Sequence, residues 1–374
     1  IKNTYSKNQI ILIMTNECCI SVIVPMFNAS KFIKKTLLSL IDQDFKEQFE
    51  VIIVDDCSSD NSLELAKSFN NPKIKIYSLN SNSGPARARN FGLQNANGKY
   101  ISFLDADDLI HKEMLSKLYQ TAVEKNYDLV FCDHEWIENN INQRKNCFSY
   151  EKDKEIKKKD LLEEMKFRIH NPLHVGGPLS SKGKLIKNSF ITKNKIRFEE
   201  NLRYLEDEIF MWQVLANVKN LKFLRKQYYL YNVNPNISTA VTQGINFGFS
   251  VEKFKIIKNH IKQSFKILGV KDKELEDLGD QAFIYFIINV LISYCKSILQ
   301  KKVKKERGQK ILRSLIVEIL SSSDVSSAIK KYKISKNESY WIPKFIMLKL
   351  TKFLEISCFK RANKIIKIRN SNFI

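Results

Sequence analysis

Residues 100–108 read Tyr-Ile-Ser-Phe-Leu-Asp-Ala-Asp-Asp, an apolar run typical of a buried strand that is followed at once by clustered carboxylates. Open α/β sheets bind their ligands at the carboxyl ends of such strands. Clustered carboxylates repel one another, and a divalent cation with oxygen ligands, such as Mg²⁺ or Mn²⁺, relieves that repulsion. Taken alone, the stretch also fits a solvated acidic turn in which Asp108 caps a helix that starts near Leu109.

The chain before this stretch alternates between β-branched apolar runs and segments with helical periodicity. This alternation predicts a mostly parallel sheet with right-handed crossovers, and the near-continuous apolar strands suit a sheet covered on both faces. No glycine-rich dinucleotide fingerprint is present, which argues against a dehydrogenase-type domain. Strands are predicted over 19–24, 49–54, 74–77 and 100–103, and helices over 30–43, 62–69 and 86–96.

The 374 residues carry a formal net charge of +22, and most of this charge lies in the last third of the chain. Residues 251–374 hold 27 Lys and Arg against 11 Asp and Glu. A basic surface attracts phosphate-rich partners, namely nucleic acid, anionic lipid or a pyrophosphate-linked substrate. A solvated basic face without a partner is the other interpretation.

The composition changes along the chain predict three parts: an N-terminal extension over 1–18, an α/β domain over 19–250, and a basic helical domain over 251–374. Residues 140–170 are polar and rich in Lys, and we expect a mobile or inserted segment there. The uncharged stretch 281–295 is shorter than the roughly 20 residues that a membrane span needs, so we expect a buried core helix. The scattered cysteines predict reduced thiols in a cytoplasmic protein.

Five motifs follow one another between residues 19 and 235: 21–28 (SVIVPMFN), 54–60 (VDDCSSD), 84–92 (GPARARNFG), 103–108 (FLDADD) and 197–210 (RFEENLRYLEDEIF). In this order they resemble the motifs of family 2 glycosyltransferases. The resemblance implies a GT-A fold, in which helices flank a Rossmann-like, mostly parallel sheet. It also implies inverting transfer of a sugar from a nucleotide-sugar, with UDP as the expected nucleotide, during synthesis of a bacterial surface glycan.

The resemblance also implies a metal site for Mn²⁺ or Mg²⁺. Asp107 matches the direct ligand of the family, and Asp105 matches the residue that holds the ribose or completes the metal shell. A cation held there would stabilise the charge that develops on the leaving nucleoside diphosphate.

Nucleotide binding is implied for residues of the first three motifs. Asp56 would accept the ring N–H of uracil, although loop capping together with Ser58 is its other interpretation. The turn of Pro25, Phe27 and Asn28 would approach the base and ribose through its backbone. Arg87 and Arg89 lie two apart, so on a helix they diverge and one is expected to be solvated. The list of implied nucleotide-binding residues is Pro25, Phe27, Asn28, Asp56, Ser58, Arg89 and Asp105.

The resemblance places the catalytic base in the pair Glu206-Asp207. An inverting transferase needs a carboxylate that takes the proton of the acceptor hydroxyl. We expect Asp207 to be this base and Glu206 to position the acceptor. An acidic first turn that merely complements the helix dipole is the alternative interpretation.

Other features leave the partner open. The basic, aromatic segment 341–354 predicts either contact with an anionic membrane, on the inner face of the cell membrane, or a packing surface between subunits. The acceptor is expected to be a glycan or a lipid-linked glycan, and nucleic acid is not expected. The turn 174–178 is predicted to face the substrate, whereas Tyr228, Tyr229 and Tyr231 are predicted to pack. Two alternative functions are considered. One is a sugar nucleotidyltransferase, but this sequence lacks the basic glycine-rich loop of that class, and the other is a nucleic-acid-binding protein.

Overall fold

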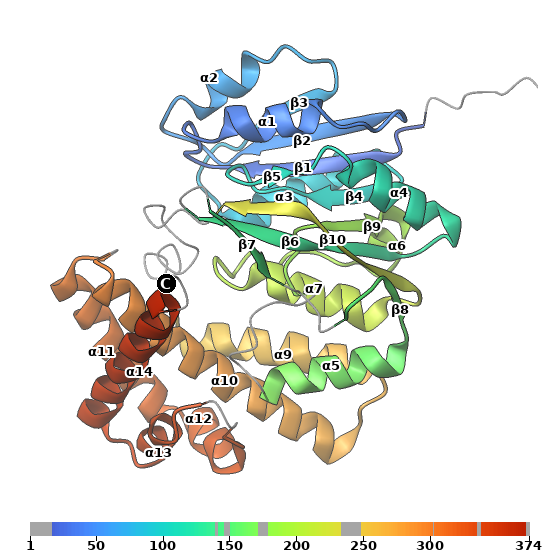
Figure 1. The fold of residues 1–374 in the computed structure, drawn as a ribbon. Coiled ribbons are helices and arrows are strands. Elements are labelled where there is room, and N and C mark those ends of the chain that lie inside the picture. The colour runs from blue at the N-terminus through green and yellow to red at the C-terminus, as the bar shows by residue number, and fades with distance from the viewer. Residues whose placement is uncertain are drawn as a thin grey trace, which may run out of the picture.

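A ten-stranded mixed sheet forms the centre of the computed structural model (Figure 1). The structure describes residues 17–138, 141–145, 150–170, 179–232, 248–301, 303–334 and 338–371. The strands are β1 (Ile20–Met26), β2 (Phe49–Asp55), β3 (Ile74–Ser78), β4 (Tyr100–Phe103), β5 (Leu109–Ile110), β6 (Leu129–Glu138), β7 (Ile141–Lys145), β8 (Lys154–Ile156), β9 (Lys184–Lys187) and β10 (Leu221–Asn232).

The first half of the sheet is parallel, which confirms the prediction from the alternating pattern. β1 pairs in parallel with β2 and β4, and β2 with β3, so the carboxyl ends of these strands meet at one edge. The short strand β9 runs antiparallel between β4 and β6, and β6 is parallel to β10. The strand order is β3-β2-β1-β4-β9-β6-β10-β5, with β7 beside β6 and β8 beside β10.

Two apolar layers cover the faces of the sheet, because side chains alternate along each strand. Val22 and Val24 of β1 pack with α1 (Ile33–Ile41) and α4 (Met114–Glu124). Ile23 points to the opposite face, where α3 (Pro85–Gln94) and α7 (Glu206–Asn217) lie. The short helices of this part of the chain are α2 (Ser62–Lys67) and α6 (Asn188–Lys193).

Residues 150–170 are not a mobile segment, and their interpretation as an inserted segment stays a prediction. They form β8 and the helix α5 (Lys158–His170), which packs on α10 (Asp272–Leu299). Leu161, Met165 and Ile169 are buried, and their four-residue spacing places them on one side of the helix. The charged residues between them hide this stripe in the sequence; they are Glu163, Glu164, Lys166 and Arg168.

The chain from residue 248 onward is helical, as predicted, and gathers at one end of the molecule (Figure 1). Its apolar side chains join the same core as α3 and α7, and the division at residue 250 stays a prediction. In the described part of the chain, α10 is the one helix long and apolar enough to cross a membrane. Most of α10 is buried, as expected of a core helix. The other helices are α9 (Val251–Ile267), α11 (Lys305–Ser321), α12 (Ser323–Ala328), η1 (Ile329–Lys331), α13 (Trp341–Met347) and α14 (Thr351–Ser371).

Candidate active site

The loops after β1 and β2 carry several of the predicted nucleotide-binding residues, and hydrogen bonds join the two loops. The Asn28 backbone amide donates to Ser58 Oγ (3.0 Å), and Asn28 Oδ1 accepts from the Ser59 amide (2.8 Å). Phe27, next to this bridge, has 42 % of its surface exposed. Pro25 lies inside β1, so the strand does not end at the proline as predicted, and Pro25 belongs to the strand rather than to the turn.

Asp56 organises the loop that precedes α3. Its Oδ1 accepts from the Ser83 amide and its Oδ2 from the Gly84 amide, each at 2.7 Å. Burial raises the pKa of Asp56, and these two amides oppose that rise. Each carboxylate oxygen keeps a second lone pair. Recognition of a nucleobase by Asp56 therefore stays a prediction.

The acidic loop after β4 is fixed from two sides. The Thr36 hydroxyl of α1 lies 2.9 Å from the carbonyl oxygens of Ala106 and Asp108. The buried Asp108 carboxylate accepts from the Tyr229 hydroxyl (2.6 Å) and from the Asn232 amide (2.8 Å). The interpretation of Asp108 as a helix cap is wrong, because the residues after it pair with β10 as β5.

Asp105 lies between two cations. Its Oδ1 accepts from the Arg89 guanidinium at 2.9 Å, and its Oδ2 lies 2.7 Å from Lys182 Nζ. Lys182 also lies 3.5 Å from Asp108 Oδ2 and 4.3 Å from the centroid of the Tyr231 ring. Burial would raise the pKa of Asp105, but the charges of Lys182 and Arg89 outweigh it and hold that pKa well below its usual range. This carboxylate therefore stays ionised at neutral pH.

Asp107 is the carboxylate of this loop that remains available to a ligand. Among the described residues, no other residue forms a hydrogen bond or ion pair with it. Burial and the charge of Asp105 raise the pKa of Asp107. One oxygen atom from each of Asp105, Asp107 and Asp108 lies within 4.8 Å of the other two. An all-oxygen set of this kind suits Mg²⁺ or Mn²⁺, and Lys182 and Arg89 already offset part of its negative charge.

The predicted base and its neighbour stand at the start of α7. Leu205 precedes them with a φ of +67°, a left-handed conformation that costs free energy in a residue with a side chain. Glu206 is buried, and its Oε1 accepts from Arg89 at 3.0 Å. Burial and the charge of Asp207 raise the pKa of Glu206, against the effect of Arg89. Because Arg89 binds both Glu206 and Asp105, the start of α7 and the acidic loop form one cluster.

Three members of this cluster, Lys182, Tyr229 and Tyr231, carry no local sequence motif of a site. Lys182 lies in a stretch that matches none of the five motifs, and neither periodicity nor spacing marks it. Tyr229 and Tyr231 were predicted to pack in a strand, but they also contact Asp108 and Lys182. Their two-residue spacing places both side chains on one face of β10, and this spacing is the sequence feature that indicates a shared role. The predicted substrate-facing turn 174–178 lies outside the described residues.

The Glu208 carboxyl makes stability depend on pH. Burial and the charge of Asp207 raise the pKa of Glu208 to about 7 from an ordinary value of 4.5. Between pH 4.5 and 7 the folded state therefore binds more protons than the unfolded state. The free energy of unfolding falls as the pH rises through this range, by up to about 3 kcal/mol. We expect Glu208→Gln to reduce this decline in urea unfolding measured from pH 5 to 8, and the part that remains comes from Glu206 and Asp108, whose pKa values are raised in the same direction. The exposed Glu124→Gln is the control, and an unchanged slope in Glu208→Gln would contradict the assignment.

Comparison with known proteins agrees with the resemblance, and the family profile spans the first four of the five motifs. A sequence profile described as Glycosyl transferase family 2 matches residues 21–174. Poly(ribitol-phosphate) beta-N-acetylglucosaminyltransferase TarP of Staphylococcus aureus is 30% identical over 259 residues, which cover 68% of this chain and 75% of that enzyme. The S. aureus enzyme TarS is 30% identical over 214 residues, 56% of this chain and only 35% of TarS. The cholesterol galactosyltransferase of Borreliella burgdorferi is 27% identical over 345 residues, 89% of this chain and 92% of that enzyme.

Solved structures share the architecture. The crystal structure of S. aureus TarS 1-349 in complex with UDP-GlcNAc aligns with a TM-score of 0.61 and 23% identity. The alignment covers 93% of this chain and 91% of the TarS chain, so the likeness extends into the helical C-terminal region. The sheet order, the helical C-terminal part and this likeness confirm the GT-A-like fold. Given the match to TarP over three quarters of that enzyme and the match of the family profile, the chain belongs to glycosyltransferase family 2.

Proposed function

We propose that the protein is an inverting, metal-dependent glycosyltransferase that moves a sugar from a UDP-sugar onto a hydroxyl group of a surface glycan. The observation that carries the proposal is the double ion pair of Arg89, which joins the acidic loop to the start of α7. The residues expected to hold the diphosphate and the residue expected to deprotonate the acceptor are therefore neighbours. UDP-GlcNAc bound in the TarS structure supports a UDP-sugar as the donor. Family membership favours this function over that of a nucleotidyltransferase or a nucleic-acid-binding protein.

In this proposal the acceptor oxygen attacks the anomeric carbon as the bond from that carbon to the diphosphate oxygen breaks. Asp207 takes the hydroxyl proton, and UDP departs with the bonding electron pair. Attack on the face opposite the leaving group inverts the anomeric configuration. Glu206, neutral or paired with Arg89, would position the acceptor without competing for the proton.

Asp107, together with Asp105, would hold Mn²⁺ or Mg²⁺, and a bound cation would offset the charge of the diphosphate. Lys182 adds a fixed positive charge at the same place, since its ammonium group lies between Asp105 and Asp108. We therefore expect Lys182 to contact the diphosphate as well.

The acceptor is proposed to be a phosphate-containing glycan or a lipid-linked glycan. TarS and TarP are named for poly(ribitol-phosphate), and the Borreliella enzyme for cholesterol. The net charge of +22 favours an acceptor that carries phosphate. The rate of sugar transfer from UDP-GlcNAc is measured once with poly(ribitol-phosphate) and once with a lipid-linked saccharide as the acceptor. The faster reaction identifies the preferred acceptor.

Thermal unfolding with UDP and Mn²⁺ tests the donor site. A ligand at one hundred times its Kd stabilises the folded state by about 2.7 kcal/mol, which corresponds to a rise in Tm of about 3 °C for a chain of 374 residues. We expect this rise with UDP and Mn²⁺, its loss on addition of EDTA, and a smaller rise in Asp107→Asn. The exposed Asp42→Asn is the matched control. No shift with UDP in the presence of either Mn²⁺ or Mg²⁺ would refute the donor site.

A further inference from the structure

The C-terminal helices expose a row of large apolar side chains that sugar transfer does not use. Trp341, Leu348 and Phe353 are exposed to 57%, 56% and 55%. The Trp341 ring stacks on Phe345 at 5.7 Å between centroids, and Phe345 lies 5.6 Å from Phe353. A contiguous exposed apolar patch marks a site of contact. We call it the α13–α14 surface, and its further exposed members are Tyr340, Met347, Leu350 and Ile356.

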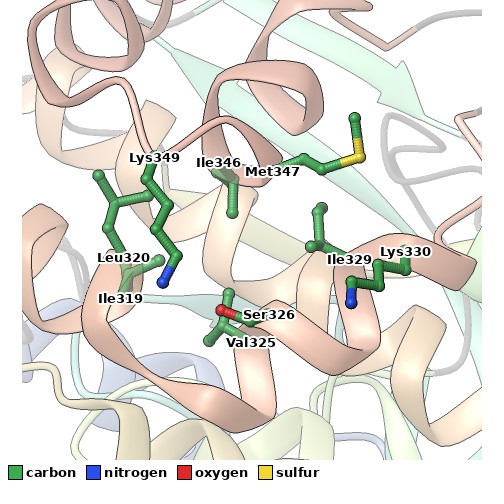
Figure 2. Close-up of a pocket in the computed structure, with 9 residues that line it drawn as sticks. All are labelled: Ile319, Leu320, Val325, Ser326, Ile329, Lys330, Ile346, Met347 and Lys349. Atoms are coloured by element: carbon green, nitrogen blue, oxygen red, sulfur yellow. The ribbon is translucent and has the colours of Figure 1, made fainter.

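A cavity of about 270 Å³ borders this surface. Met347 belongs to both, and Lys330 and Lys349 flank the apolar walls from two sides (Figure 2). The remaining lining residues come from α11, α12, η1 and α13 and are Ile319, Leu320, Val325, Ser326, Ile329 and Ile346.

Lysines alternate with the exposed apolar residues. Lys344 lies 5.3 Å from the centroid of the Tyr340 ring, and Lys349 and Lys352 are exposed. The nearby Glu355 is already paired with Arg313 at 3.0 Å, so it does not balance these charges. The surface therefore combines apolar and cationic groups with little acidic charge.

This combination selects among the partners that could cover the surface. Two copies of the chain meeting through the same patch would bring lysines against lysines, which is unfavourable. Nucleic acid would pair with the lysines but would leave exposed aliphatic side chains such as Leu348 without an apolar environment. An anionic lipid layer supplies both phosphate charge and an apolar interior, and aromatic and basic side chains suit its boundary.

We propose that the α13–α14 surface docks the protein on an anionic membrane. Trp341 and Phe353 enter the headgroup layer, the lysines contact lipid phosphates, and the neighbouring cavity receives part of one acyl chain. This inference goes beyond sugar transfer and is independent of it, because membrane binding is measured without donor or acceptor.

Sedimentation of the full chain with vesicles tests the proposal. We expect binding to vesicles of equal parts phosphatidylcholine and phosphatidylglycerol, little binding to phosphatidylcholine alone, and weakening by salt. The triple change Lys344→Gln, Lys349→Gln and Lys352→Gln should lower the partition coefficient about a hundredfold, near fivefold for each lysine. Trp341→Ser with Phe353→Ser should lower it about tenfold or more.

A matched control changes exposed apolar residues elsewhere: Leu38→Ser on α1 with Val123→Ser on α4 should leave binding intact. Unchanged thermal unfolding shows that each variant is folded. Vesicle binding that survives both surface variants would overturn the proposal. So would a wild-type oligomer that the Trp341 and Phe353 changes dissociate while vesicles do not bind, or equally tight binding to double-stranded DNA.

Discussion

Replacing Asp207 with Asn is expected to lower the rate of sugar transfer by about 10²–10⁴-fold, the usual contribution of a general base. Asn keeps the size of the side chain and the oxygen that accepts from the Glu208 amide at 2.8 Å. It loses only the ability to take a proton. The Tm rise caused by UDP and Mn²⁺ should therefore stay unchanged, and product formation from UDP-GlcNAc is the measurement.

Glu208→Gln is the matched control, because it removes a carboxyl group from the same helical turn. We expect a change in transfer rate of no more than a few-fold in that variant. If Asp207→Asn retains turnover, or if Glu208→Gln is equally inactive, the assignment of the base is wrong. Loss of the UDP-dependent Tm rise in Asp207→Asn would instead place Asp207 in the donor site.

Arg89→Met is expected to destabilise the fold by about 3–5 kcal/mol, because it leaves the buried Glu206 carboxyl without its cation and removes one of the two cations that pair with Asp105. The Arg89 side chain is only 5% exposed, and it donates to Asp105 and Glu206. Met has a similar length and fills most of the space, so the loss reports charge pairing more than packing. Urea unfolding at neutral pH is the measurement, with Tm as a second readout.

Arg87→Met provides the control within the same helix. Arg87 is 59% exposed and lies 3.5 Å from Glu200, and surface pairs of this kind contribute about 0–1 kcal/mol. Adding Glu206→Gln to Arg89→Met should restore part of the stability, because one unpaired charge disappears. Equal effects of Arg87→Met and Arg89→Met would contradict the buried network.

Arg87 and Arg89 show what can and cannot be predicted from local sequence. Two residues apart on a helix, Arg87 and Arg89 had to point in different directions, and the prediction that one of them is solvated is confirmed. The helical period could not identify the partners of Arg89. Glu206 is 117 positions away in the chain, and only the packing of α3 beside α7 brings the two together.

The acidic loop after β4 shows the same limit of prediction from local sequence. Asp105, Asp107 and Asp108 follow a strand, so their common place at the sheet edge was predictable. Their different surroundings were not: Asp108 is bound by Tyr229, Asp105 by two cations, and Asp107 by no other described residue. Those contacts come from α3, from β10 and from the segment before β9, and the local sequence around the aspartates does not specify them.

The order of apolar runs and helical segments was enough to establish an α/β sheet with its parallel half and a carboxylate-bearing edge, because each of these features follows from the side-chain period within one short segment. The motifs also indicated the family. The tertiary structure alone decided the charge balance of the site. Lys182 and Arg89 reach the acidic loop only when strands and helices distant in the chain are packed together, and the energies of buried charges depend on such neighbours.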